Sequence, residues 1–155
     1  MAAPELYVFA ISHYCEKARF GLDVLGIDYR LVHLPPGPHG QRAQELGASE
    51  SSLPILVADG EVVQGSSEIL DWAEAASPAD RSLACDDVEG IERRLDDVAG
   101  VHARRCFYSE ALLEHPDTVL PMFLKGLPPD EADATAAAWP VITQVMQQRM
   151  ELGRE

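Results

Sequence analysis

The sequence predicts an α/β region followed by a region made of helices alone. Residues 5–34 read as strand, helix and strand, which is a βαβ unit and demands a parallel strand pair. Residues 53–64 hold two short apolar runs around Asp59-Gly60, a strong β-hairpin signal. After residue 85 only helical periodicity continues. The element order is therefore βαβ, then a helix, then ββα, then a bundle of helices.

The first βαβ unit is justified by local signals. Residues 5–10 form a short apolar run with Tyr, Val and Phe, which favours a strand. The stretch 14–25 partly follows helical spacing, and Gly26 stands where a helix-ending glycine belongs. Residues 27–34 again favour a strand. The other elements predicted for this region are a loop at 35–40, a helix at 41–46, strands at 53–58 and 61–64, and a helix at 66–76 capped by Ser66 or Ser67.

The second region is predicted to be helical after a linker at 77–85, which begins with Ser77-Pro78-Ala79-Asp80. A long helix is expected from 86 to 113, and 114–128 is expected to be mostly loop, with at most one helical turn. A last helix starts near Pro128-Pro129, and Pro140 should kink or interrupt it. The apolar stripe of the long helix is Val88, Ile91, Leu95, Val98, His102 and Cys106.

Composition and charge narrow the possible functions. The 155 residues carry a formal net charge of −14, which argues against nucleic acid and anionic membrane surfaces as partners. No signal peptide or membrane-spanning run is visible. Three cysteines without paired spacing do not form a disulfide framework, so a reducing, cytoplasmic setting is expected, and no metal is expected. Acidic runs such as Asp86-Asp87, Asp96-Asp97 and Asp130-Glu131 are interpreted as solvated helix faces.

The stretch Ser12-His13-Tyr14-Cys15 stands where the first strand gives way to the first helix. The first N–H groups of a helix have no partner within it, and the helix dipole is positive there, so an anion or a thiolate is stabilised. A purely structural interpretation is equally physical: Ser12 caps the helix, and Cys15 is a small buried residue. On this stretch alone both interpretations stay open.

Three spaced motifs resemble one known family. Residues 11–20, which read ISHYCEKARF, look like the start of the glutathione S-transferases of a bacterial type. Leu53-Pro54-Ile55-Leu56 is similar to that family's cis-proline strand. Gly65-Ser66-Ser67-Glu68-Ile69 is similar to its S-x-x-I helix start. The resemblance covers residues 5–76 and implies a thioredoxin-like, glutathione-binding domain at 1–76, the linker at 77–85, and a short all-helical domain at 86–155.

The resemblance also implies chemistry. Glutathione would be the co-substrate, and its thiol would be activated for transfer to a small hydrophobic electrophile, as in detoxification. Ser12 would stabilise the thiolate, and Cys15 is the rival catalytic group. Cys15 holds the last place of the four-residue motif, so it cannot form a disulfide within that motif. The residues implied to bind glutathione are Leu53, Pro54, Ser66, Ser67 and His39. Those expected at the second-substrate cleft are Tyr14, His102, Arg104, Arg105 and Tyr108.

Two departures from the family pattern keep alternatives open. Gly65 stands where the family often has Asp, Glu or Gln, and the second domain is shorter than usual. Three functions therefore remain: a transferase acting through Ser12, a glutathione-dependent thiol–disulfide oxidoreductase acting through Cys15, and a non-catalytic glutathione-binding or regulatory module. A homodimer is compatible with each of them.

Overall fold

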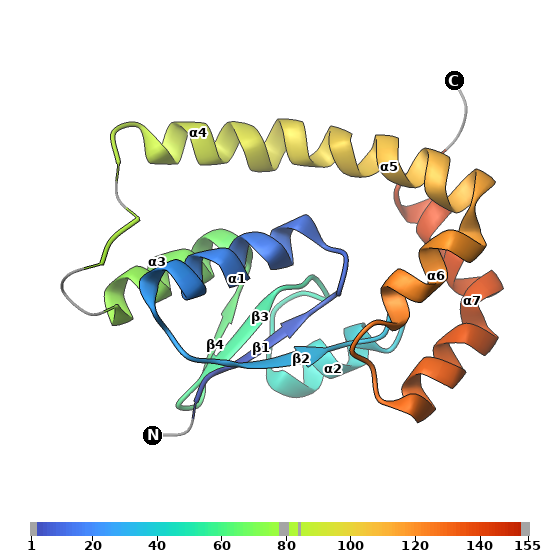
Figure 1. Ribbon diagram of the computed structural model, residues 1–155, viewed down its shortest axis with the longest axis horizontal. Coiled ribbons are helices and arrows are strands. Elements are labelled where there is room, and N and C mark those ends of the chain that lie inside the picture. Colours follow the sequence, from blue (N-terminus) through green and yellow to red (C-terminus); the bar gives the residue numbers. More distant parts are fainter. Residues whose placement is uncertain (1–2, 78–80, 84, 153–155) are drawn as a thin grey trace.

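The computed structural model describes residues 3–77, 81–83 and 85–152. Its four-stranded sheet has the order β2-β1-β3-β4, with α1 and α3 on one face and α2 on the other (Figure 1). This is the predicted thioredoxin-like architecture. The strands are β1 (Glu5–Val8), β2 (Arg30–His33), β3 (Ile55–Ala58) and β4 (Glu61–Gln64), and the helices are α1 (His13–Leu25), α2 (His39–Leu46) and α3 (Ser66–Ala76).

The strand pairing follows the sequence signals. β1 pairs in parallel with β2, and β3 lies antiparallel to both β1 and β4. The β3–β4 turn places Asp59 and Gly60 at φ 48° and 87°, as a two-residue hairpin requires. β1 is shorter than predicted because the chain turns before the helix, where the Ser12 N–H donates to the Phe9 carbonyl at 3.3 Å.

An apolar core packs α1 and α3 against the sheet. Leu6, Leu22, Leu56 and Ile69 are fully buried within it. Burial of an aliphatic side chain of this size stabilises a fold by about 1.5–3 kcal/mol. The core therefore fixes the start of α1 at the end of β1, which is where the functional candidates lie.

Helix ends agree with the sequence at α1 and differ at α3. The Ser12 hydroxyl accepts a hydrogen bond from the Cys15 N–H at 3.3 Å, so Ser12 is the N-cap of α1, and Gly26 ends that helix at φ 72°. The predicted cap of α3 is wrong, because Gly65 holds the N-cap position without a side-chain cap bond. Only glycine adopts its φ of 107° readily, and Ser66 is then drawn into the buried first turn.

The second region is all-helical, as predicted, but differs in detail. A helix occupies most of the stretch expected to be loop, because Val119 and Phe123 on it are buried. The last helix runs through Pro140 without interruption, since Trp139 and Thr143 on either side are buried and hold it in place. The helices are α4 (Val88–Arg94), the π-helical segment η1 (Leu95–Gly100), α5 (Val101–Glu114), α6 (Pro116–Leu124) and α7 (Pro129–Arg149).

A second apolar cluster holds α5, α6 and α7 together. Its buried members are Tyr108, Leu112, Val119, Phe123 and Trp139. The indole N–H of Trp139 donates to a backbone carbonyl of α6 at 3.2 Å, so its polar atom is satisfied within the cluster.

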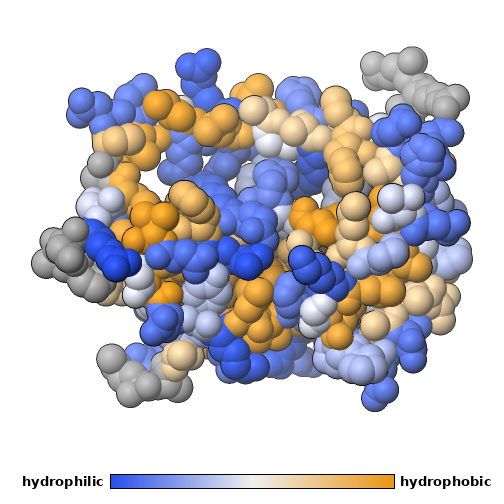
Figure 2. Space-filling model, in the orientation of Figure 1, coloured by the Kyte–Doolittle hydropathy of each residue, from blue (hydrophilic) through white to orange (hydrophobic). Residues whose placement is uncertain are grey.

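The apolar stripe predicted on the long helix is largely exposed rather than buried. Ile91 is 50% exposed, Leu95 57% and Val98 55%. Apolar side chains lie along this helix at the top of the view in Figure 2. The face toward α1 instead carries Glu92 and Asp96, which bond Lys17 of α1. Asp96 is therefore part of an inter-helix contact and not of a solvated face.

The segment Pro78-Ala79-Asp80 of the predicted linker lies outside the described residues. The domain limits stay a prediction, although two separate apolar clusters lie on the two sides of this segment, and Phe9 packs against both. Among the described residues no helix combines the length and the apolar character needed to cross a membrane.

Candidate functional site

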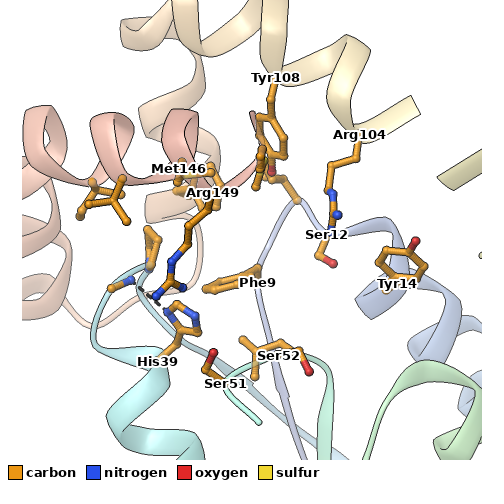
Figure 3. Close-up of a pocket in the computed structure, with 18 of the residues that line it drawn as sticks. Phe9, Ser12, Tyr14, His39, Ser51, Ser52, Arg104, Tyr108, Met146 and Arg149 are labelled. Carbon is orange, nitrogen blue, oxygen red and sulfur yellow. Dashed lines mark hydrogen bonds between the residues drawn. The ribbon is translucent and has the colours of Figure 1, made fainter. Parts of the chain in front are cut away.

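A cavity of about 740 Å³ lies between the carboxyl end of β1 and the helices of the second region (Figure 3). One wall comes from the sheet side and the other from α5, α6 and α7. The sheet side contributes Phe9, Ile11, Ser12, His13, Tyr14, Pro36, Gly37, His39, Glu50, Ser51, Ser52 and Leu53. The helical wall contributes Ala103, Arg104, Phe107, Tyr108, Phe123, Val141, Ile142, Val145, Met146, Arg149 and Met150.

Ser12 lies on this cavity at the positive end of α1. Its hydroxyl oxygen accepts the capping bond from the Cys15 N–H. The same hydroxyl also interacts with the Cys15 thiol, and because a hydroxyl rotates, its O–H can turn into the cavity and donate to a ligand atom. A hydroxyl donor beside a helix N-terminus is suited to an anionic ligand atom.

Cys15, the rival group, is fully buried and does not line the cavity. Burial raises the pKa of its thiol above the ordinary value, against the opposing effect of the hydrogen bond with Ser12. A thiol that stays protonated is a poor nucleophile. Cys15 is placed for packing beneath the start of α1.

The loop before β3 and the start of α2 form the lower part of the cavity. The Leu53–Pro54 peptide bond is cis, and Leu53 lines the cavity. The His39 ring packs edge-on against Phe9 at 4.7 Å between ring centroids, and its Nδ1 accepts the Gly37 N–H at 3.0 Å. Burial, and then the Arg149 guanidinium, lower the pKa of His39, while a hydrogen bond to the Pro35 backbone raises it. The ring is neutral, and because Nδ1 accepts a hydrogen bond, the ring proton is on Nε2.

Ser66 and Ser67 lie at the start of α3, outside the residues that line the cavity. Ser66 is buried. The Ser67 hydroxyl accepts a hydrogen bond from the Lys17 ammonium at 3.0 Å and lies 3.3 Å from the Asp96 carboxylate. The sequence therefore identified a helix start at which one of the two hydroxyls, that of Ser67, already bonds side chains of this chain.

Lys17 is the centre of that network. Its ammonium lies 2.5 Å from the Asp96 carboxylate and also pairs with Glu92. The Tyr14 hydroxyl donates to the backbone carbonyl of Asp96 at 2.8 Å. Burial opposes the charge of Lys17, but the hydrogen bonds to the two carboxylates outweigh it and raise its pKa. Through Lys17 and Tyr14, α1 is fastened to the long helix beside the cavity.

The expected second-substrate residues separate into two groups. Tyr14 and Tyr108 line the cavity, and burial raises the pKa of Tyr108 to about 12. His102 is exposed, and the Arg105 guanidinium donates to a carbonyl near the end of α7 at 3.5 Å, so neither lines the cavity. Arg104, which the sequence also placed at this cleft, does line it, and so does Phe107, which sequence reasoning missed.

The π-helical segment η1 explains this shift of face. Each residue of an α-helix turns the chain by about 100°, and a π-helical turn holds one additional residue. Side chains after η1 therefore point in a direction that a continuous α-helical pattern does not predict. Gly100 at its end also permits a close approach, since a Cβ there would lie 3.0 Å from both the His13 ring and the Tyr14 hydroxyl. In the sequence, the available signal for this close approach was the glycine at position 100 within a predicted helix.

The part of the chain that the structure describes contains no cluster of three or more side chains able to hold a metal ion. The polar side chains that line the cavity are hydroxyls, imidazoles, guanidinium groups and the Glu50 carboxylate.

Residues 6–81 match the family model described as the glutathione S-transferase N-terminal domain. This region therefore belongs to the glutathione S-transferase family of N-terminal domains. No curated protein gave a significant sequence match.

Solved structures of this family share the fold. The glutathione transferase GSTFuA2 from Phanerochaete chrysosporium is 16% identical with a TM-score of 0.55, over 100% of this chain and 66% of that one. The transferase CsGST63524 from Ceriporiopsis subvermispora, solved with glutathione, is 14% identical with a TM-score of 0.56, over 99% and 62%. Glutaredoxin 2 from Salmonella typhimurium, also solved with glutathione, is 19% identical with a TM-score of 0.51, over 96% and 70%. The chain thus spans less than two thirds of the length of the two transferases.

Proposed function

We propose that this chain binds glutathione in the cavity and that Ser12 holds the glutathione thiol as a thiolate for transfer to an electrophile. The observation that carries the proposal is the position of Ser12, at the positive end of α1 on the wall of a cavity whose opposite wall is apolar. A free thiol has a pKa of about 8.5, so a drop of about two units makes the thiolate the dominant form at neutral pH. The Ser12 O–H and the helix dipole both act in that direction.

The two ends of glutathione have separate places in this proposal. Leu53 offers its backbone to the extended tripeptide, as an edge strand does. The neutral His39 ring donates its Nε2–H toward the glycyl carboxylate, with Arg149 beside it. The N–H groups at the start of α3, around Ser66 and Ser67, take the γ-glutamyl carboxylate.

Gly65 leaves no side chain of its own for the γ-glutamyl amine, but a nearby carboxylate occupies that space. The Glu68 carboxylate oxygen lies 2.1 Å from the position that a Cβ at residue 65 would take. A carboxylate there is suited to an ammonium group. We therefore assign Glu68 the role that a side chain at position 65 has in other family members.

The oxidoreductase route through Cys15 has less support, because its thiol is buried and its pKa is raised. The non-catalytic alternative remains an outcome of the test. Its support is the Ser67 hydroxyl, which the chain itself engages through Lys17 and Asp96.

The proposal is tested by titration calorimetry with glutathione and by turnover of an aryl halide. Ser12→Ala should keep glutathione binding and lower kcat about 10- to 100-fold, since a hydrogen bond to a charged group is worth about 1.5–3 kcal/mol. Ser12→Thr is the matched control, because it retains both the hydroxyl and the helix cap. Cys15→Ser should retain most activity. Unchanged turnover in Ser12→Ala contradicts the role of Ser12. Saturable glutathione binding by the native protein without turnover contradicts the transferase function and supports the non-catalytic binding module.

A further inference from the structure

The helical wall of the cavity combines apolar side chains with a positively charged one. Most of it is apolar, formed by Phe107, Phe123, Val141 and their neighbours on α5 to α7. Arg104 is the exception beside Ser12, and Figure 3 shows its side chain reaching from α5 toward Ser12. An apolar wall with a single fixed cation near the reacting group indicates what kind of second substrate fits.

Arg104 lacks a partner of its own. Its Nε atom is buried and has no hydrogen-bond partner in the described part of the chain, which also offers it no ion pair. A buried donor left without a partner costs about 1–3 kcal/mol. The neighbouring Arg105, by contrast, donates to a backbone carbonyl. An acceptor group on a ligand would satisfy this donor.

The surrounding charges do not neutralise this guanidinium. Burial, and then Arg104, lower the pKa of His13, so that ring is neutral and adds no second positive charge. Glu50 is the one carboxylate that lines the cavity among the described residues, and it belongs to the sheet-side wall, before β3. In a chain of net charge −14, an unpaired cation beside Ser12 is a local reversal of the overall field.

We propose that the electrophile accepted here carries a carboxylate on an apolar, aromatic-sized body, and that this carboxylate binds Arg104. The inference rests on the proposed glutathione function and names its second substrate. The apolar body lies against Phe107 and Phe123, and the carboxylate forms charge-assisted hydrogen bonds with the guanidinium. Arg149 does not compete for it, because that cation lies at the His39 end, where glutathione has its own carboxylate.

The reaction balances without any further reactant. For an aryl chloride, the glutathione thiolate forms a C–S bond to the ring carbon that bears chlorine, and chloride leaves with the bonding electron pair. The thiol proton goes to solvent. Arg104 touches the carboxylate of the acceptor and takes no part in the bond changes, so it acts as a specificity residue.

The first test is binding, which does not depend on turnover. The unreactive 4-methyl-3-nitrobenzoate and its methyl ester are titrated into the full chain in the presence of glutathione. The acid should bind at least about 10-fold more tightly than the ester, as one charge-assisted contact implies. Arg104→Gln should remove that preference, and Arg105→Gln is the matched control because Arg105 lies outside the cavity lining.

The second test is turnover of 4-chloro-3-nitrobenzoate and its methyl ester, each rate divided by the uncatalysed rate with glutathione. Arg104→Gln should lower kcat/KM for the acid about 10- to 100-fold and leave the ester unchanged, while Arg104→Lys recovers part of the loss. Equal losses for acid and ester, or acid that binds no better than ester, overturn the inference. Preferred binding of the acid without turnover of either compound sustains the inference and contradicts the transferase function instead.

Discussion

Replacement of Lys17 by Met tests how α1 is fastened to the long helix. In the native chain one ammonium group forms ion pairs with the carboxylates of Asp96 and Glu92 and donates a hydrogen bond to the Ser67 hydroxyl. Met retains the length and apolar stem of the side chain and removes only the charge and its donors. The two carboxylates, four residues apart on one helix, are then left facing each other.

The magnitude follows from how much water reaches the three groups. The side chains of Lys17, Asp96 and Glu92 are 21%, 23% and 28% exposed, so solvent screens them only in part. Removal of one partner of a buried ion pair costs about 3–5 kcal/mol, and that of an exposed one about 0–1 kcal/mol. The intermediate exposure predicts a loss of about 2–3 kcal/mol at pH 7, which corresponds to a fall of Tm by about 5–10 °C in a chain of this size.

The pH dependence gives the sign of this loss. The raised pKa of Lys17 means that its contribution is complete below its ordinary value of 10.5 and disappears as pH rises through the folded value. Hydrogen bonds from Lys17 lower the pKa of Glu92 although burial opposes them, so that contribution is present above 4.5 and lost as pH falls through the folded value. The difference in the free energy of unfolding between the native protein and Lys17→Met should therefore be largest between these two pH limits and smaller beyond either of them.

Urea unfolding followed by circular dichroism measures the difference, at pH 7 and at pH 3.5. The double variant Lys17→Met/Asp96→Asn should recover at least about 1 kcal/mol relative to the sum of the two single losses, because only Glu92 stays charged and the repulsion between two carboxylates is gone. A loss below about 0.5 kcal/mol at pH 7, or strictly additive single losses, would refute the reasoning that this network holds the two helices together.

Two further predictions concern a thiol and a glycine. Iodoacetamide should alkylate the exposed Cys106 of the native protein at least about 10-fold faster than Cys15, because the Cys15 thiol is buried and its pKa is raised. Mass spectrometry measures the two rates, and equal rates would contradict this prediction. Gly126→Ala should destabilise the fold by about 2–4 kcal/mol, since φ is 81° and a Cβ would lie 2.3 Å from the His33 ring. Gly47→Ala, at φ 88° with open space around it, should cost only about 1–2 kcal/mol in the same urea assay, and equal losses would exclude the contact with His33.

The first region was predictable because its signals are local. Asp59 and Gly60 specify a two-residue turn, Gly26 ends a helix, and Ser12 caps one, each through the conformation or hydrogen bond of a few neighbouring atoms. The cap of α3 was the exception. Ser66 and Ser67 are good caps in isolation, but Gly65 adopts a backbone conformation that starts the helix one residue earlier than a Ser66 cap would allow.

The candidate site was only half predictable, for a geometric reason. The sequence by itself determined that Ser12 stands at a strand–helix junction and that Tyr14, His39 and Leu53 belong near it. It could not determine which face of the long helix meets them. Hydrophobic periodicity reports the spacing of apolar residues along a helix. The rotation of the helix about its axis depends instead on η1 and on polar contacts between residues far apart in sequence, such as Lys17 and Asp96, which are 79 residues apart. Only the tertiary structure therefore brought Arg104 over Ser12.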